Sequence, residues 1–350
     1  MTSGTPHETY MTRCLDLAEL GLGHAAPNPL VGSVIVFNDR IIGEGFHHMY
    51  GGPHAEVNAV NAVTDKSLLP RSVLYVNLEP CPHSGKTPPC ADLIIKTGIP
   101  EVVIGTTDPN PLVSGNGVRK LKQAGVKVTF GVLHGQCVAL NRRFFTFHNN
   151  KRPHVILKWA QTSDGFIDIL REGPGIQQPV WISNEISRML VHKWRSEEQS
   201  ILVGTQTALM DNPRLDVREW PGNSPIRMVI DRKLRLSKAL NLFDNACPTL
   251  VFNELKDTTE DQTHYVRIDF TGSLIETLLR YLYTKDIQSV FVEGGQRLLN
   301  SFIMENLWDE ARVFIGHKRF EAGISAPVIQ HIEPEEYRIR EDVLFFFRNK

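Results

Sequence analysis

The sequence lacks several features that would assign it to common classes of protein. None of its 350 residues belong to an apolar run that approaches the 18 needed to span a membrane. The first ten residues are polar and contain no hydrophobic segment of a secretory leader. Positive charge is not in excess, because 38 Lys and Arg residues nearly balance 39 Asp and Glu residues. These absences predict a cytoplasmic protein that binds neither a membrane nor nucleic acid.

Cysteine is also scarce, and its placement argues against a disulfide-stabilised fold. There are five cysteines: Cys14, Cys81, Cys90, Cys137 and Cys247. Cys81 and Cys90 belong to one short motif, and the other three are scattered singly. This spacing fits a reducing compartment. A dinucleotide-binding glycine motif is missing too, because Gly21-x-Gly23-x-x-Ala26 closes a predicted helix instead of following a strand.

The most informative stretch that is present begins at His54-Ala55-Glu56 and continues with Pro80-Cys81 and Pro89-Cys90. A His, a Glu two residues on, and two later Pro-Cys pairs are typical of zinc deaminases. One imidazole and two thiolates hold Zn²⁺ and leave a fourth position open for water. A single His or Cys is usually a core residue, but this combination favours a metal site. Glu56 is the predicted proton carrier, because that carboxylate must not bind the metal.

Hydrophobic periodicity predicts alternating helices and strands in the first half. The expected elements are helix 8–23, strands 33–37 and 40–45, a helix starting at His54, strand 73–78, helix 91–97, strand 102–106, helix 115–124, strand 126–131 and helix 138–147. Strand 73–78 should deliver Cys81 to the helix start that carries Cys90. Two helix N-termini then converge on the metal and favour thiolates. The order predicts a three-layer α/β/α domain.

Longer motifs in this half resemble one particular family. They are Asn28-Pro-x-Val-Gly32, Glu79-Pro-Cys81-x-His83-x-Gly85-Lys86-Thr87-Pro-Pro-Cys90 and Asp108-Pro-Asn110-Pro. Together with the His54 motif they are similar to the bifunctional deaminase/reductase of riboflavin biosynthesis. That resemblance also accounts for the eight residues between the two cysteines, where the common deaminase pattern has two. It implies a cytidine-deaminase-like fold.

The resemblance implies a role for each matching residue. His54, Cys81 and Cys90 would bind zinc and Glu56 would carry protons. The residues implied to line the pyrimidine and ribose-phosphate pocket are Asn28, His47, Lys86, Asp108 and Asn110. A simple turn role remains open for Asn28, and a helix-start or turn role for Asp108 and Asn110.

A second domain is expected after the polar run that ends at Pro153. The boundary is placed between residues 1–148 and 149–350. The predicted elements of the second part are strands 155–159, 200–204, 226–231, 249–252 and 289–293, and helices at 204, 274–283 and 297–305. Strands that alternate with helices predict another α/β domain.

The second half resembles the reductase part of the same family. The matching motifs are Lys158-x-Ala160-x-x-Ser163-Asp164-Gly165, Trp181-Ile182-Ser183, Gly204-x-x-Thr207-x-x-x-Asp211-Asn212-Pro213-x-Leu215-x-x-Arg218 and Val292-Glu293-Gly294-Gly295. The resemblance implies a dihydrofolate-reductase-like fold that uses NADPH. Independently, Gly294-Gly295 before a helix allows a close approach of an anionic diphosphate to backbone N–H groups.

Site residues of the reductase follow from the resemblance. Those expected to contact NADPH are Ala160, Trp181, Thr207, Asp211 and Gly295, and those expected to contact substrate are Arg195, Leu215, Arg218 and Glu293. Guanidinium groups suit a ribose 5-phosphate, although solvated surface arginines are the alternative. Lys158 and Glu293 are the predicted catalytic pair, against the alternative of an ion pair that only braces two strands.

One residue departs from the family pattern. Ser163 stands in the turn before Asp164-Gly165, where the family usually has Leu. This turn adjoins the cofactor site, so the departure bears on the reductase and not on the deaminase.

Three hypotheses for function follow. The first is a bifunctional enzyme that deaminates a phosphoribosylated diaminopyrimidinone with zinc and then reduces its ribosyl chain to ribityl with NADPH. The second is a zinc deaminase whose C-terminal domain is a non-catalytic binding module. The third is a nucleic-acid base deaminase with an accessory domain, which the balanced charge and the long Cys81–Cys90 loop disfavour. A homo-oligomer, either a dimer or a tetramer, is also expected.

Overall fold

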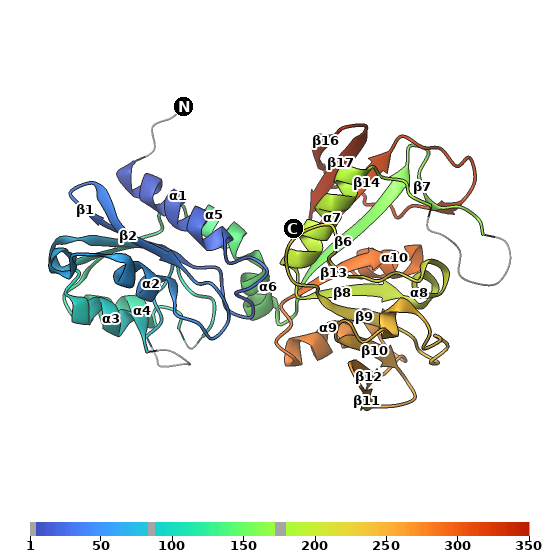
Figure 1. Ribbon diagram of the computed structural model, residues 1–350, viewed down its shortest axis with the longest axis horizontal. Coiled ribbons are helices and arrows are strands. Elements are labelled where there is room, and N and C mark those ends of the chain that lie inside the picture. Colours follow the sequence, from blue (N-terminus) through green and yellow to red (C-terminus); the bar gives the residue numbers. More distant parts are fainter. Residues whose placement is uncertain (1–4, 83–87, 112, 172–179, 350) are drawn as a thin grey trace. The chain divides into compact units, whose positions relative to one another are not determined.

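The chain folds into two compact units, Met1–Lys151 and Arg152–Lys350 (Figure 1). The computed structural model describes residues 5–82, 88–111, 113–171 and 180–349. Both units are α/β, as the sequence predicts, and each has its own core.

The first unit is built on one five-stranded sheet in the order β2-β1-β3-β4-β5. Its elements are α1 (Pro6–Glu19), β1 (Gly32–Phe37), β2 (Arg40–Phe46), α2 (Ala55–Ala62), η1 (Lys66–Arg71), β3 (Val73–Leu78), α3 (Cys90–Thr97), β4 (Glu101–Thr106), α4 (Asn116–Gln123), β5 (Lys127–Phe130), α5 (His134–Leu140) and α6 (Arg142–Asn150). Strand β1 is antiparallel to β2 and β3, and β3, β4 and β5 are parallel.

Helices cover both faces of this sheet because its central strands are apolar throughout, and successive side chains of a strand point to opposite faces. Ile35, Leu74 and Ile104 pack against α2, α3 and α4 on one face. Val34 and Tyr75 pack against α1 and α5 on the other. Figure 1 shows the resulting three layers. This arrangement places the N-termini of α2 and α3 beside the loop that follows β3.

The prediction of a single helix over residues 138–147 is wrong. The chain instead forms α5 and α6, which meet at Asn141. The Asn141 side chain accepts a hydrogen bond from the Leu30 N–H at 2.7 Å and donates one to the Leu30 carbonyl at 2.8 Å. The break therefore lets a buried amide hold the turn that contains Asn28.

The second unit has a larger, mainly parallel sheet. Its elements are β6 (His154–Thr162), β7 (Phe166–Asp168), α7 (Glu185–Glu197), β8 (Ser200–Gly204), α8 (Thr205–Asp211), β9 (Ile226–Ile230), η2 (Asn241–Phe243), β10 (Thr249–Asn253), β11 (Thr258–Glu260), β12 (Thr263–Arg267), α9 (Leu274–Thr284), β13 (Ser289–Gly294), α10 (Gln296–Met304), β14 (Glu310–Gly316), β15 (Ile324–Ser325), β16 (Glu335–Ile339) and β17 (Asp342–Arg348).

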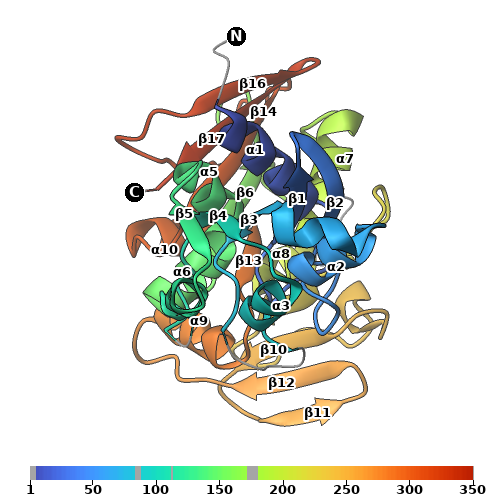
Figure 2. The same ribbon diagram turned by 90° about the vertical axis from the view of Figure 1, so that its left-hand side faces the viewer.

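Within the described part of this unit, ten strands run in the order β11-β12-β10-β9-β8-β13-β6-β14-β17-β16. Figure 2 shows β11 and β16 at the two opposite edges. The strands from β12 to β14 are parallel to one another, and β11 and β17 pair antiparallel with the two ends of this group. Helices α9 and α10 cover one face, and α7 and α8 cover the other. The carboxyl ends of β6, β8 and β13 therefore lie at the same edge of the sheet, where open α/β sheets bind ligands.

Candidate active sites

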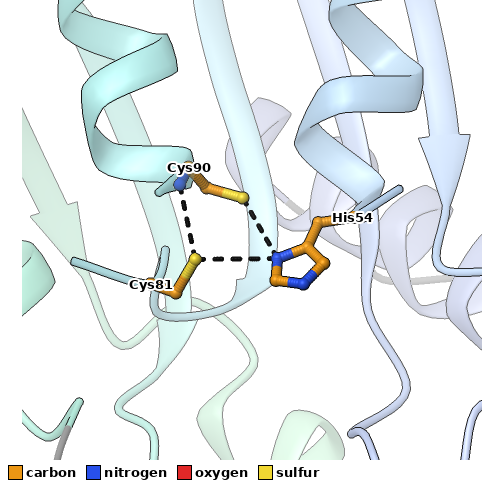
Figure 3. A group of neighbouring side chains, drawn as sticks. All are labelled: His54, Cys81 and Cys90. Atoms are coloured by element: carbon orange, nitrogen blue, oxygen red, sulfur yellow. Dashed lines mark hydrogen bonds between the residues drawn. The ribbon is translucent and has the colours of Figure 1, made fainter. Parts of the chain in front are cut away.

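Three side chains from two helix starts and one loop form the candidate metal centre (Figure 3). His54 precedes the first residue of α2, Cys90 is the first residue of α3, and Cys81 lies in the loop after β3. The His54 Nδ1 lies 3.6 Å from the Cys81 Sγ and 3.3 Å from the Cys90 Sγ. Figure 3 shows the three side chains pointing toward one another.

These donors fit a zinc ion. Ligand atoms about 2.0–2.3 Å from a tetrahedral centre lie roughly 3.3–3.8 Å apart, which matches the two separations to His54. Hydrogen bonds from the Cys90 thiol and from His54 lower the pKa of the Cys81 thiol to about 4, although burial opposes them. The Cys90 backbone N–H also donates to the Cys81 Sγ at 3.3 Å. The site therefore favours a thiolate, the form that binds metal, at Cys81. The hydrogen bond to Cys81 and burial raise the pKa of the Cys90 thiol.

Glu56 lies in the first turn of α2 and is only 3% exposed. Burial raises the pKa of its carboxyl to about 7, and the negative charge of Cys81 acts in the same direction. A carboxyl with a pKa near neutrality can both give and take protons. Two residues from a ligand and shielded from solvent, Glu56 has the position and the chemistry of a proton carrier.

The structure brings Asn28 and His47 to this centre. The Asn28 Nδ2 lies 3.0 Å from the His47 Nε2, and the His47 ring packs edge-on against His54 at a centroid distance of 5.5 Å. The His47 Nδ1 lies 3.0 Å from the Pro53 carbonyl oxygen. Asn77 helps to hold the same turn, because its side chain bonds to the backbone of Gly32 and Leu30.

The Asp108 carboxylate interacts electrostatically with Cys81 of the metal centre, and Asn110 lies in the same loop as Asp108. The Asp108 carboxylate accepts a hydrogen bond from the Asn110 N–H at 2.7 Å. Burial raises the pKa of Asp108 to about 7, and the charges of Glu79 and Cys81 add to this effect. The fifth predicted pocket residue, Lys86, lies outside the described residues.

Glu79 is a residue of this site that sequence reasoning missed. Its carboxylate is buried and accepts hydrogen bonds from the backbone N–H groups of Gly115 at 2.9 Å and Val118 at 3.0 Å. The backbone N–H of Asp108 donates a longer hydrogen bond of 3.4 Å to the same carboxylate. Because Glu79 stands two residues before Cys81, it ties the metal-ligand loop to the Asp108 loop and to the start of α4. The signal in the sequence that could have identified Glu79 as a site residue is its charge within the Glu79-Pro-Cys81 motif.

In the second unit, a buried charge cluster joins Lys158 in the middle of β6 to Glu293 near the end of β13. Arg195 on α7 makes a bidentate ion pair with Glu293, with an Nε–Oε1 distance of 2.6 Å and an Nη2–Oε2 distance of 2.9 Å. The Lys158 Nζ lies 3.9 Å from the Glu293 Oε2. Burial alone would raise the pKa of Glu293, but the charges of Arg195 and Lys158 outweigh it and lower that pKa to about 2. Burial lowers the pKa of Lys158.

The two arginines predicted to contact phosphate differ in exposure. The Arg195 side chain is 11% exposed, whereas that of Arg218 is 43% exposed. Both form hydrogen bonds with Asp216. The Arg195 Nη1 donates to the Asp216 carbonyl oxygen at 3.0 Å, and the Arg218 Nη1 donates to the Asp216 carboxylate at 2.6 Å. Leu215 is buried in the adjoining core. Arg195, Leu215, Arg218 and Glu293 are therefore gathered around one segment.

A separate group fits a dinucleotide. Gly295 has a φ of 75° and precedes α10, whose first turn has no side-chain cap. A Cβ at Gly295 would lie 3.1 Å from the Thr207 Oγ1 on α8. Thr207 and Gly295 therefore leave a narrow cradle, with the free N–H groups of α10 available for a diphosphate of NADPH.

The remaining predicted cofactor residues have varied surroundings. The Asp211 carboxylate forms an ion pair with Arg171 at 2.9 Å. Trp181 is exposed and packs its ring against the Arg188 guanidinium. Ala160 lies on β6. The described contacts do not join Trp181 or Ala160 to the Thr207–Gly295 cradle.

Comparisons with known proteins agree with these two sites. The family model of the cytidine and deoxycytidylate deaminase zinc-binding region matches residues 5–106, and that of the RibD C-terminal domain matches residues 153–320. The riboflavin biosynthesis protein RibD of Aquifex aeolicus is 38% identical, over 97% of this chain and 98% of its own. The RibD of Actinobacillus pleuropneumoniae is also 38% identical, over 93% of this chain and 88% of its own.

Solved structures give the same result. One is a diaminohydroxyphosphoribosylaminopyrimidine deaminase/5-amino-6-(5-phosphoribosylamino)uracil reductase from Thermotoga maritima. It is 38% identical with a TM-score of 0.89, and the match covers 98% of each chain. The RibD of Acinetobacter baumannii is 29% identical, with a TM-score of 0.85 and 98% of each chain covered.

Fold, metal centre and matched domains together define a two-domain enzyme in which a zinc deaminase precedes a reductase. The chain belongs to the family of the riboflavin biosynthesis protein RibD. Membership confirms the expected enzyme classes, hydrolase and oxidoreductase, and the expected cofactors, Zn²⁺ and NADPH. It gives no support to a non-catalytic C-terminal module. No helix in the described ranges is long and apolar enough to cross a membrane.

Proposed function

We propose that residues 1–148 deaminate 2,5-diamino-6-(5-phosphoribosylamino)pyrimidin-4(3H)-one and that residues 149–350 then reduce the product to 5-amino-6-(5-phosphoribitylamino)uracil. The observation that carries this proposal is the pairing of two unlike buried sites in one chain. His54, Cys81 and Cys90 converge in one unit, and a cationic cluster around Glu293 occupies the other. The name of the Thermotoga maritima relative supports the substrate. The two compact units support the boundary near residue 150.

In the deaminase, His54, Cys81 and Cys90 would hold the zinc ion. A zinc ion bound by three protein ligands lowers the pKa of a water to about 7 and so supplies a nucleophile at neutral pH. Glu56 would take one proton from that water and pass it to the ring nitrogen, and would then pass the second proton of the same water to the amino group, which leaves as ammonia. Asn28, His47, Asp108 and Asn110 orient the pyrimidine and its ribose phosphate, with Lys86 as a further phosphate ligand. Exclusion of solvent from Glu56 and Asp108 favours these transfers, because buried charges interact strongly.

In the reductase, Thr207, Asp211, Ala160, Trp181 and Gly295 would hold NADPH, which supplies a hydride for C1′ of the ribosyl group. Opening of the ribose ring places negative charge on its former ring oxygen. Lys158 stabilises that charge, since a positioned cation in a buried site is worth more than one in water.

Other residues of the reductase bind the sugar. Glu293 orients the ribose hydroxyls, and Leu215 is a further substrate contact in the segment next to Arg195. Arg218 and the remaining N–H groups of Arg195 bind the phosphate, for which guanidinium is the matching donor. The bidentate pair of Arg195 with Glu293 keeps both side chains in fixed orientations, so the two groups act as one unit.

Lys158→Met is the variant that tests this assignment. It keeps an unbranched side chain only one atom shorter and removes the charge. We expect deamination to continue while the deaminated ribosyl compound accumulates and NADPH oxidation falls at least about a hundredfold, the scale of removing one charge-stabilising group. Lys193→Met is the matched control, because Lys193 is a half-exposed lysine on α7 that pairs with Glu197. Normal NADPH turnover per folded molecule of Lys158→Met would contradict the proposal and leave Lys158 as a brace between two strands.

We also propose a cytoplasmic homodimer or homotetramer. The single cysteines support the cytoplasmic location, because they fit a reducing compartment. Light scattering of the purified chain tests the oligomeric state, and a mass equal to one chain would contradict it.

A further inference from the structure

We propose that His192 is a positioning residue of the reductase, which holds the backbone of Arg218 and thereby aims that guanidinium at the phosphate of the substrate. The inference rests on the proposed function, in which Arg218 binds this phosphate. His192 itself touches neither substrate nor cofactor in this account. Nothing in the sequence motifs above singles it out.

The geometry begins with α7. His192 and Arg195 are three residues apart and therefore share one face of the helix. The His192 ring is 4% exposed, and its Nδ1 accepts a hydrogen bond from the backbone N–H of Arg218, with an N–N distance of 3.3 Å. Arg195 donates to the Asp216 carbonyl oxygen at 3.0 Å. Helix α7 therefore holds the segment 215–218 at two points.

This segment needs such anchors. Leu215 has a φ of 53°, in the left-handed region that residues with a branched side chain rarely adopt. The Val217 N–H donates to the Ser224 Oγ at 3.0 Å, which leaves the Arg218 N–H as the next backbone donor to be satisfied. Without this acceptor the Arg218 N–H would lose the hydrogen bond that fixes its direction. His192 supplies the acceptor and fixes where the Arg218 side chain starts.

Only one form of the imidazole can do this. To accept from an N–H, Nδ1 must carry a lone pair, so the hydrogen resides on Nε2, which lies 3.8 Å from the Glu219 Oε1. Burial lowers the pKa of His192, and so do the charges of Arg195 and Arg218, while Glu219 and Glu293 act in the opposite direction. These surroundings favour the neutral ring. Protonation would turn an N–H of His192 against the N–H of Arg218 and break the contact.

Three variants of the full chain test the proposal. His192→Asn places an amide oxygen near the position of Nδ1, His192→Gln places its amide near Nε2, and His192→Leu removes both functions. Each is assayed for NADPH-dependent reduction of the deaminated phosphoribosyl compound. We expect the Leu and Gln variants to raise KM for this compound roughly tenfold, as expected for an unpaired N–H, with little change in kcat. His192→Asn should restore KM to within about threefold, and KM for NADPH and the deaminase rate should stay unchanged.

The Arg218→Ala variant separates this inference from the proposed function. It should raise KM for the phosphorylated compound and leave KM for the dephosphorylated riboside unchanged. If Arg218→Ala has no effect on either, the phosphate role of Arg218 is wrong, whatever His192 does. If Arg218→Ala acts as expected but the Leu and Gln variants keep the wild-type KM, the positioning role is overturned. An Asn variant as impaired as the Gln variant would overturn it too, and this pair decides the matter if His192→Leu does not fold.

Discussion

Glu56 is the residue whose chemistry is most narrowly defined by its surroundings. It follows the ligand His54 by two positions and is shielded from solvent. We expect Glu56→Gln to lower deamination at least about a hundredfold, the usual scale of general acid–base catalysis, because an amide of the same shape cannot carry protons. Zinc content and reduction of the already deaminated compound should persist. Loss of the metal, measured by elemental analysis, would instead make Glu56 a ligand or a scaffold residue.

Glu293 gives a prediction about pH. Its pKa is lowered from 4.5 to about 2 in the folded chain, because the charges of Arg195 and Lys158 outweigh burial. A carboxyl with a depressed pKa stabilises the fold above its ordinary pKa, and this contribution is lost as the pH falls through the folded-state value. The wild-type chain should therefore melt at a higher temperature than Glu293→Gln at pH 6. The difference should narrow as the pH falls from about 4.5 toward 2.

Calorimetry of the two proteins between pH 6 and 3 checks this expectation, because the variant lacks the titrating group and is otherwise the same chain. Other ion pairs of this unit, such as that of Arg152 with Asp309, are present in both proteins and therefore do not contribute to the difference. A difference in melting temperature that stays constant over this range would show that Glu293 is not an ionised carboxylate held by Arg195.

At the scale of elements, the connection between β3 and α4 controls the deaminase site. A Cβ at Gly117 in α4 would lie 2.0 Å from the Pro80 carbonyl oxygen, so α4 begins in direct contact with the metal-ligand loop. Glu79 accepts from N–H groups at this helix start. An anion is also favoured there by the helix dipole. The carboxylate thus connects Cys81, the Asp108 loop and α4.

Glu79→Gln should loosen this connection, because an amide nitrogen cannot accept from an N–H. We expect a loss of about 1–3 kcal/mol of unfolding free energy and a several-fold higher KM for deamination, with zinc retained. Asp92→Asn is the control: Asp92 pairs with Lys120 at the surface, and removing such a pair costs at most about 1 kcal/mol. Equal effects of the two variants on KM would contradict a specific role for Glu79.

Periodicity predicted most elements that carry the sites. Strands β3 and β8 have the predicted bounds, and α2 begins just after His54 as expected. Strand β14 was missed because Glu310 and Arg312 interrupt its apolar pattern. Both are buried, and they pair with each other at 3.0 Å. Charges that neutralise each other inside a core look like surface residues in a sequence. Helix α7, which carries Arg195, was not predicted either.

At the scale of the whole chain, the two candidate sites differ in how far they can be predicted. The zinc ligands stand in short motifs at two helix starts and in the loop after β3, so their types and spacing indicate a metal site before any fold is known. The reductase cluster joins Lys158, Arg195 and Glu293 from β6, α7 and β13. Their mutual distances follow from sheet order, which no local pattern contains. Family resemblance supplied these residues, and the structure adds the contacts between them.

One chain with two sites is expected to perform two successive reactions on one substrate. The most direct measurement is mass spectrometry after incubation of the zinc-loaded full chain with the diaminopyrimidinone ribosyl phosphate, with and without NADPH. Without NADPH we expect only the deaminated ribosyl compound, and with NADPH its ribityl product, at the cost of one NADPH for each molecule formed. An unchanged substrate in both reactions, or a deaminated compound that NADPH leaves unreduced, would contradict the account.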